Sequence, residues 1–376
     1  MNGGASGDAT RAMISLGAFR HNIGCVRSYC GAAVRVMPVV KANAYGHGLM
    51  ALAGEAASGG ADALAVARVS EALELRREGI ALPLLVFEIP PAPSIEGALA
   101  EGVELTVSTR DSAADISAAA SRAGTAARVH VKVDTGMTRL GFPAEIAAEE
   151  IAGVLRLPRI ELAGVYSHFA TSDEADTTFA RLQIARFRDL LERLRRGGIE
   201  PPLVHMANSG AVIQLPEAHF GMVRPGIMLY GYPPSRALAE RHPVTPVLTL
   251  VSTISMLRTV EPGTTVSYGR RYAARTKTVI ATVPIGYGDG YSRLLTGRAE
   301  VIIRGRRYPV AGTICMDHIM VDLGPQTDCS AGDVVTLIGR DGGEAITAWD
   351  IASALGTIPY EVTCAIAARV PREYVA

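Results

Sequence analysis

The chain has 376 residues, 48% of them hydrophobic and 20% charged, a composition typical of a globular protein and not of a disordered or collagen-like chain. Basic and acidic residues each number 37, so zero net charge gives no electrostatic reason to expect nucleic acid or an anionic membrane as a partner. No apolar run approaches the roughly 20 residues that span a bilayer, and no signal peptide or CxxC pair is visible. We expect a cytoplasmic protein of about two domains without a metal site.

Short β-branched runs alternate with helical segments over the first 230 residues. Eight strands alternating with helices predict a (β/α)8 barrel, which we place at residues 17–240. A doubly wound open sheet is the alternative, because the eighth strand is short. The eight predicted strands lie at 34–40, 63–66, 84–89, 105–108, 128–133, 160–167, 203–207 and 222–224.

Polar residues follow several of these strands, where barrel enzymes build their active sites. This favours the barrel over the open sheet. The residues concerned are Lys41, 134–139, His168, Asn208, Ser209 and Arg224.

After residue 240 the pattern changes to strand-like runs separated by turns such as EPGT and SAGD. Helical periodicity persists only near 347–356 and 360–368. A mostly β domain is therefore predicted for 241–376. The segment RAMISL at 11–16 precedes the first barrel strand and is a candidate strand of this second domain, which the sequence leaves open.

The segment VVKANAYGHG at 39–48 places Lys41 directly after a buried strand. Desolvation at a barrel mouth favours the neutral amine, which is a nucleophile and a base. The alternative is a solvated lysine that ends a strand, and this segment taken alone favours that alternative.

Two further segments, NSG at 208–210 and RPGIMLYG at 224–231, follow strands seven and eight. Barrels commonly bind phosphate between these loops. Ser209 supplies a hydroxyl, and Gly226 and Ile227 supply approachable backbone. A lysine after strand one together with this phosphate-binding cradle indicates a site for pyridoxal phosphate (PLP). Each segment taken singly is also explained as an ordinary turn.

The chain resembles the alanine racemase family over nearly its whole length. The resemblance implies an N-terminal barrel, a C-terminal β domain, PLP and a homodimer with shared active sites. The matching segments include VVKANAYGHG (39–48), HVKVDTGMTRLGF (130–142), HMANSG (205–210), VRPGIMLYG (223–231), VSYGRRY (266–272), PIGYGDGY (284–291) and GTICMDHIMVDLG (312–324).

Racemisation removes the Cα proton from one face and returns one to the other, so two bases are wanted. By resemblance, Lys41 holds PLP and is the base for the D enantiomer, and Tyr268 of the partner subunit is the base for the L enantiomer. Arg224 is expected to donate to an unprotonated pyridine nitrogen, which shortens the life of the carbanion and so disfavours side reactions.

The resemblance assigns the remaining site residues as well. Arg139 and the backbone of Met316 bind the substrate carboxylate. Lys132 is a candidate for carbamylation, with an ordinary strand lysine as the alternative. Further cofactor contacts are expected from Tyr45, His168, Asn208, Ser209, Gly226, Ile227 and Tyr360, and a substrate entrance from Tyr287, Tyr291 and Asp317.

The predicted activity is the interconversion of L-alanine and D-alanine, and D-alanine is expected to serve as a peptidoglycan precursor. A racemase for serine or lysine on the same fold is the nearest alternative. A decarboxylase of related architecture would carry an acidic partner for the pyridine nitrogen in place of Arg224, and a non-catalytic PLP-binding protein would need only the barrel.

Overall fold

The computed structural model describes residues 7–241 and 243–376, which divide into two compact units. The barrel unit comprises Ala18–Ala44 and Leu49–Thr245. The β unit comprises the residues up to Gly17, the short segment Tyr45–Gly48, and Pro246–Ala376.

Eight parallel strands form the barrel unit, in the order β2-β10-β9-β8-β6-β5-β4-β3. Val39, just after β2, bridges Ala65 of β3 in parallel and links the two ends of this order, so the predicted barrel is confirmed and the open sheet is not. A two-residue strand, β7 (Phe142–Pro143), pairs with β6 and was not predicted. The strands are β2 (Arg35–Val36), β3 (Leu64–Val66), β4 (Leu84–Val86), β5 (Glu104–Val107), β6 (Ala127–Asp134), β8 (Ile160–Tyr166), β9 (Val204–His205) and β10 (Met222–Val223).

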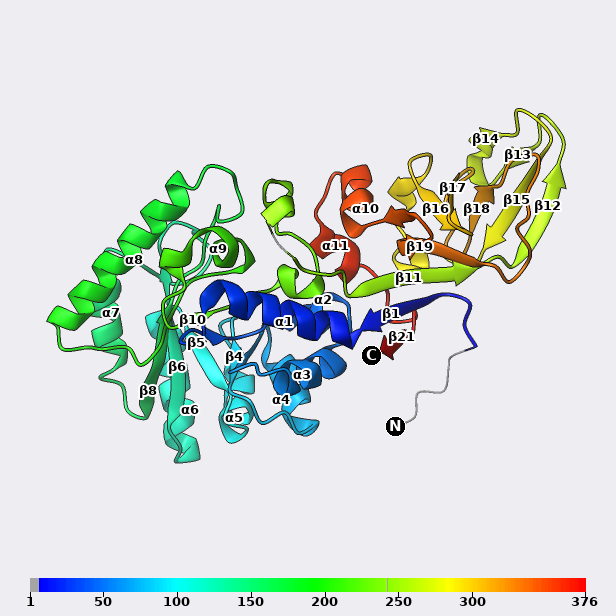
Figure 1. Ribbon diagram of the computed structural model, residues 1–376. Helices are drawn as coiled ribbons and strands as arrows, with labels where there is room; N and C mark the ends of the chain where they lie inside the picture. The colour runs from blue at the N-terminus through cyan, green and yellow to red at the C-terminus, as the bar shows by residue number, and fades with distance from the viewer. Residues whose placement is uncertain (1–6, 242) are drawn as a thin grey trace. The chain divides into compact units, whose positions relative to one another are not determined.

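Helices lie on the outer side of these strands (Figure 1). The longest helix, α8 (Thr178–Arg196), shows why. Its buried residues recur at helical spacing, and its charged residues face away from the strands. No helix of the described residues is long and apolar enough to cross a membrane. The helices are α1 (Leu16–Cys30), α3 (Leu49–Ser58), α4 (Val69–Arg77), α5 (Ala92–Ala100), α6 (Arg110–Ala123), α7 (Ala147–Val154), α8 (Thr178–Arg196) and α9 (Ser209–Gln214), with 3-10 turns at Pro216–Ala218, Ile227–Tyr230 and Arg236–Arg241.

Strand β6 shows how the barrel unit positions its polar groups. Val129, Val131 and Val133 are fully buried, and the intervening His130 and Lys132 are buried as well. Barrel strands are covered on both faces, by helices outside and by packed side chains inside. Polar residues in the interior must therefore pair with one another.

The β unit contains the mostly β domain predicted for the second part of the chain. Its first strand, from the RAMISL segment, pairs antiparallel with β11 and parallel with the C-terminal β21. Two short helices match the predicted periodic segments. The elements are β1 (Arg11–Ser15), β11 (Leu248–Thr253), β12 (Met256–Val260), β13 (Thr265–Val266), β14 (Tyr272–Ala273), β15 (Thr278–Val283), β16 (Glu300–Ile303), β17 (Arg306–Pro309), β18 (Ile319–Asp322), β19 (Val334–Asp341), β20 (Glu344–Ile346), β21 (Arg372–Val375), α10 (Ala348–Leu355) and α11 (Pro359–Cys364).

Candidate active site

Lys41 begins a turn, α2 (Lys41–Tyr45), whose backbone is left-handed. Residues 42–45 all have φ between 51° and 55°, although none is glycine. Such a conformation costs roughly 1–2 kcal/mol per residue for L-amino acids. Strain of this kind persists where the surroundings hold it, and it is concentrated at functional sites.

Side chains of the barrel unit hold this turn in place. Asn43 Oδ1 accepts a hydrogen bond of 2.8 Å from the backbone N–H of Leu49. Glu71 Oε1 accepts one of 2.6 Å from the backbone N–H of Ala42, the residue after Lys41. The position of the lysine backbone is thus fixed from both sides of the strained segment.

Arg224 is buried and held by several acceptors. Its Nη1 donates to His205 Nδ1 at 2.8 Å, and its Nη2 donates to the carbonyl of Ser167 at 2.7 Å. Nη2 also lies 3.3 Å from His168 Nδ1. Burial lowers the pKa of Arg224 to about 10, so the guanidinium stays protonated at neutral pH. The site therefore contains a fixed cation that only donates.

Positive charge accumulates around His168. Burial lowers its pKa well below the ordinary histidine value, and the charges of Arg224, Lys132, Arg139 and Lys41 lower it further. His168 is consequently neutral at physiological pH. Four basic side chains of the barrel unit act on this one side chain.

Lys132 is 5% exposed, and its Nζ donates to the carbonyl of Val133 at 2.8 Å. Burial and the nearby charge of Arg224 lower the pKa of Lys132 to about 7. Its Nζ lies 5.4 Å from the ring centre of Tyr166. A lysine in this environment is about half neutral at pH 7 and can react as an amine.

The loop that carries Arg139 is shaped by Asp134. One carboxylate oxygen of Asp134 accepts from the backbone N–H groups of Gly136, Met137 and Thr138 at 2.8–3.1 Å. Burial alone would raise the pKa of Asp134, but these hydrogen bonds and the charge of Lys132 lower it. The carboxylate thus fixes the loop backbone, and the Arg139 side chain remains exposed.

The structure brings the loops after strands seven and eight together at Ser209. Its hydroxyl oxygen accepts from the backbone N–H of Gly226 at 2.9 Å and of Met228 at 3.4 Å. A serine hydroxyl has two acceptor positions and one donor. Because both acceptor positions are taken, the hydroxyl hydrogen is directed to another group, as a phosphate oxygen would require. The preceding Asn208 caps α9 and accepts from the N–H of Ala211 at 3.1 Å.

In the β unit, Tyr268 is 70% exposed, and Met316 and Tyr287 are exposed as well. Two hydrogen bonds to backbone carbonyls connect the three segments. Thr313 Oγ1 donates to the carbonyl of Tyr268 at 2.7 Å, and the N–H of Tyr287 donates to the carbonyl of Cys315 at 3.0 Å. Residues far apart in the sequence thus present exposed apolar side chains on one part of this unit.

Asp317 belongs to the same neighbourhood. Arg369 Nη2 donates to Asp317 Oδ1 at 2.8 Å and its Nε to Asp289 Oδ1 at 2.6 Å. Asp289 in turn accepts from the backbone N–H of Gly286 at 2.8 Å. Arg369 therefore ties the segment after Met316 to the GYGDGY turn.

Tyr45 and Tyr360 both belong to the β unit, and their ring centres are 5.8 Å apart. Tyr45 is buried, and burial raises the pKa of its phenol. The Gly46 residue that follows has no room for a side chain, because an added Cβ would lie 2.1 Å from the carbonyl oxygen of Thr363. These contacts set the position of both tyrosines within this unit.

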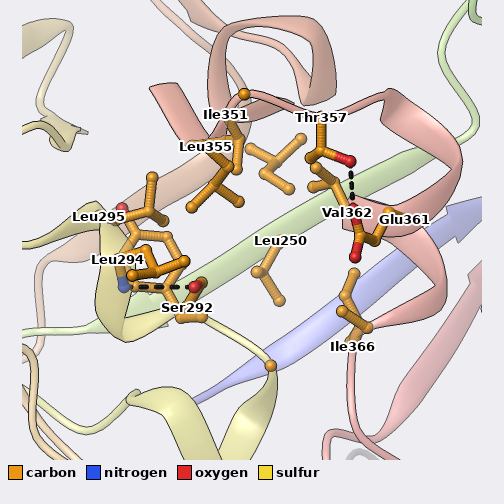
Figure 2. Close-up of a pocket in the computed structure, with 15 residues that line it drawn as sticks. Leu250, Ser292, Leu294, Leu295, Ile351, Leu355, Thr357, Glu361, Val362 and Ile366 are labelled. Atoms are coloured by element: carbon orange, nitrogen blue, oxygen red, sulfur yellow. Dashed lines mark hydrogen bonds between the residues drawn. The ribbon is translucent and has the colours of Figure 1, made fainter. Parts of the chain in front are cut away.

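Tyr291 differs from the exposed Tyr287, with which the sequence grouped it. Tyr291 is 3% exposed and lines an apolar cavity of about 340 Å3 in the β unit. Figure 2 shows the leucine and isoleucine side chains around this cavity and the hydrogen bond between Thr357 and Glu361 at one side. The burial of Tyr291 places it in a different environment from that expected of an entrance residue.

Four buried residues of the network around Arg224 were not assigned to the site from the sequence: Glu104, His130, Tyr166 and His205. The Tyr166 ring stacks on His205, with centres 4.8 Å apart and planes 1° from parallel. His130 and Lys132 are two residues apart on one strand, so they share a face. This spacing in HVKV was a visible signal that His130 points to the same interior as Lys132.

The barrel unit offers hydrogen-bond donors and four basic side chains that act on His168, one of which, Lys41, follows the first strand. Anionic phosphate and phenolate oxygens fit such a donor set, and an aldehyde fits a reactive amine. These residues define a barrel enzyme of the kind that binds PLP.

Comparisons with known proteins identify the family. A family model described as "Alanine racemase, N-terminal domain" matches residues 14–234, and one described as "Alanine racemase, C-terminal domain" matches 247–374. A curated alanine racemase 2 of Caldanaerobacter subterraneus is 43% identical over 97% of this chain and 95% of its own length. An alanine racemase of Methanococcus maripaludis is 42% identical over 96% and 98%, respectively.

Solved structures agree with the sequence relatives. An alanine racemase of Clostridium difficile 630 superimposes with a TM-score of 0.93 at 39% identity, covering 98% of this chain and 96% of the other. The alanine racemase of Bacillus anthracis with bound L-Ala-P has a TM-score of 0.92 at 36% identity over 98% and 95% of the two chains. The chain belongs to the alanine racemase family of PLP-dependent isomerases.

Proposed function

We propose that this protein interconverts L- and D-alanine. The observation that supports this most is Arg224, a buried cation fixed by His205 and Ser167 in the middle of the cationic site. PLP, when bound, supplies the electron sink for charge left at the substrate Cα. Arg224 can donate a hydrogen bond to its ring nitrogen but does not give up a proton readily, which limits the sink and favours simple proton return.

Two residues of this chain move protons in the proposal. Lys41 binds the cofactor and exchanges the Cα proton of the D enantiomer, and Tyr268 of the partner subunit exchanges that of the L enantiomer. Bases on opposite faces are what inversion at one carbon requires. The strained turn after Lys41 fixes the first of them.

The partner origin of the second base is supported by its exposure. In a single chain, Tyr268 is 70% exposed, Met316 is 53% exposed and Tyr287 is 41% exposed. Clustered exposed apolar side chains mark interaction surfaces. A homodimer that covers this cluster would exclude water from the base, as proton transfer at carbon requires.

The other predicted roles complete the proposal. Arg139 and the Met316 N–H bind the substrate carboxylate, and the product D-alanine serves as a peptidoglycan precursor. Cofactor contacts come from Tyr45, His168, Asn208, Ser209, Gly226, Ile227 and Tyr360, and the substrate entrance from Tyr287 and Asp317, without the buried Tyr291.

The test is incubation of the purified protein and PLP with pure L-alanine and, separately, pure D-alanine. Chiral chromatography should show both solutions converging on equal amounts of the two enantiomers, because the free energies of enantiomers are equal. L-serine and L-lysine serve as matched substrates and should racemise more slowly. Faster conversion of either would replace the proposed substrate, and an amine product would indicate a decarboxylase.

We also propose that Lys132 carries a carbamate. A neutral amine adds CO2 to give R–NH–COO⁻ and releases one proton, so the reaction needs the unprotonated lysine. Because the pKa of Lys132 is about 7, carbamylation should increase as pH rises through 7 and fall below it. Protein equilibrated with 13C-bicarbonate at pH 8 should show a carbamate carbonyl signal by 13C NMR, which weakens at pH 6.

The chain makes this measurement clean, because it contains only three lysines: Lys41, Lys132 and Lys277. Lys132→Met should abolish the signal. Lys277, exposed and paired with Glu261, is the matched control, and Lys277→Met should leave it unchanged. A signal that survives Lys132→Met would assign the carbamate elsewhere.

A further inference from the structure

A continuous line of hydrogen bonds runs through the interior of the barrel unit and ends at Arg224. His205 Nδ1 lies 2.8 Å from Arg224 Nη1, and His205 Nε2 lies 2.9 Å from His130 Nδ1. His130 Nε2 lies 2.8 Å from Glu104 Oε2. All four residues are at most 6% exposed. We call this line the Glu104–Arg224 relay.

The chemistry of its two ends fixes the direction of every hydrogen bond. A guanidinium only donates, so His205 accepts at Nδ1 and carries its proton on Nε2. His205 then donates to His130 Nδ1, and His130 carries its proton on Nε2. That proton is donated to Glu104, whose carboxylate only accepts. Both histidines are therefore neutral, in agreement with the burial that lowers the pKa of His205 well below its ordinary value.

The relay also explains how the buried positive charge of Arg224 is stabilised. Arg224 is a buried cation, and among residues 7–241 and 243–376 no carboxylate forms an ion pair with it. Its hydrogen-bond acceptors there are neutral imidazoles and carbonyls. An uncompensated buried charge is costly. Polarised hydrogen bonds in a chain strengthen one another, so Glu104 stabilises the cation through the two imidazoles.

We propose that Glu104 is a positioning residue for the active site, which sets the tautomers of His130 and His205 and thereby the orientation of Arg224. The inference rests on the proposed function, in which Arg224 donates to the cofactor. Glu104 lies on the β5 strand and touches Arg224 only through the relay.

The ion pair between Glu104 and Arg128 determines what the Glu104→Gln replacement does. Arg128 donates through Nε at 2.9 Å and through Nη2 at 2.7 Å to the other carboxylate oxygen, Oε1. In a Glu104→Gln protein the amide oxygen must face Arg128, because a guanidinium cannot accept. The amide N–H group then faces His130 Nε2. His130 must move its proton to Nδ1, which reverses the relay and opposes two donors between His205 and Arg224.

The experiment uses 15N-histidine-labelled holoenzyme, whose chain has only eight histidines. In the wild type, NMR should show His130 and His205 neutral with the proton on Nε2. In Glu104→Gln, both should change to the Nδ1–H tautomer. The visible absorption of bound PLP should shift, and kcat for alanine should fall roughly tenfold while KM changes less than about twofold.

Glu150→Gln is the matched control. Glu150 is 8% exposed and accepts two hydrogen bonds of 2.6 Å from Arg110, but it contacts no histidine in the described chain. Its replacement should leave tautomers, spectrum and kcat as in the wild type. The double variant Glu104→Gln/Arg128→Met frees the amide to turn its oxygen to His130, and it should restore both Nε2–H tautomers and part of kcat.

Three results would overturn the proposal: a charged or Nδ1–H His205 in the wild type, a Glu104→Gln protein indistinguishable from Glu150→Gln, or a double variant without restored tautomers. The NMR measurement of the wild-type tautomers does not depend on the folding of any variant or on catalytic turnover. If the protein failed to racemise alanine, the proposed function would fall, while the NMR result would still decide whether the relay exists.

Discussion

The Lys41→Ala protein is expected to lose the yellow colour of bound PLP and at least about 10³-fold in racemisation rate, because both the covalent attachment and one base disappear. Absorption spectroscopy and chiral chromatography would measure the two losses. Borohydride reduction of the wild type followed by peptide mapping should place the cofactor on Lys41, and only two other lysines compete for it.

Lys277→Ala is the control for this replacement, because Lys277 lies exposed on the β unit and forms a surface ion pair with Glu261. It should keep the colour and the rate. A yellow and active Lys41→Ala protein, or a reduced adduct on Lys132, would contradict the assignment of the attachment site.

Mixed dimers of Lys41→Ala and Tyr268→Phe chains should regain activity that neither homodimer has. Random reassembly of an equal mixture makes about half of the dimers mixed. If each site takes Lys41 from one chain and Tyr268 from the other, one site of a mixed dimer carries both lesions and the other carries none. The expected recovery, measured by racemisation of L-alanine, is therefore about a quarter of the wild-type rate.

The complementary mixture provides the control. Wild-type chains mixed equally with a Lys41→Ala/Tyr268→Phe double variant should also give about a quarter, because each site of a mixed dimer then carries one lesion. Sites formed within one chain would instead give no recovery in the first mixture and about half in the second. The pair of mixtures thus separates shared from unshared sites without relying on a single value.

The barrel could be predicted from the sequence because its strands have a simple signature. Several are short β-branched runs that are mostly buried, as in β6 and β8, and several are followed by helices whose buried residues recur at helical spacing, such as α6 and α8. The two-residue strands β7 and β13 lack such a signature. Their pairing depends on tertiary neighbours, which periodicity does not report.

Candidate site residues could be proposed from the sequence where they stand in a recognisable segment, as do Lys41 in VVKANAYGHG and Arg224 in RPGIMLYG. Glu104 shows why other candidates could not. Its local sequence, GVELTVS, reads as an ordinary strand start, and its link to the site passes through two histidines on other strands. Only the closure of the barrel brings these residues together. Tyr291 illustrates the converse, since its segment is recognisable but does not reveal its burial.

The left-handed turn after Lys41 has a consequence for how the protein responds to heat. Four adjacent residues there store backbone strain that the hydrogen bonds of Asn43 and Glu71 must hold. Ala44 and Tyr45 in this turn are also buried, so packing helps to hold the strain. Opening the turn would relieve that strain, which lowers the free energy of opening and favours release of the turn on warming while the barrel remains folded. Inactivation would then begin as a local and reversible event, and rapid cooling should restore the enzyme before aggregation can set in.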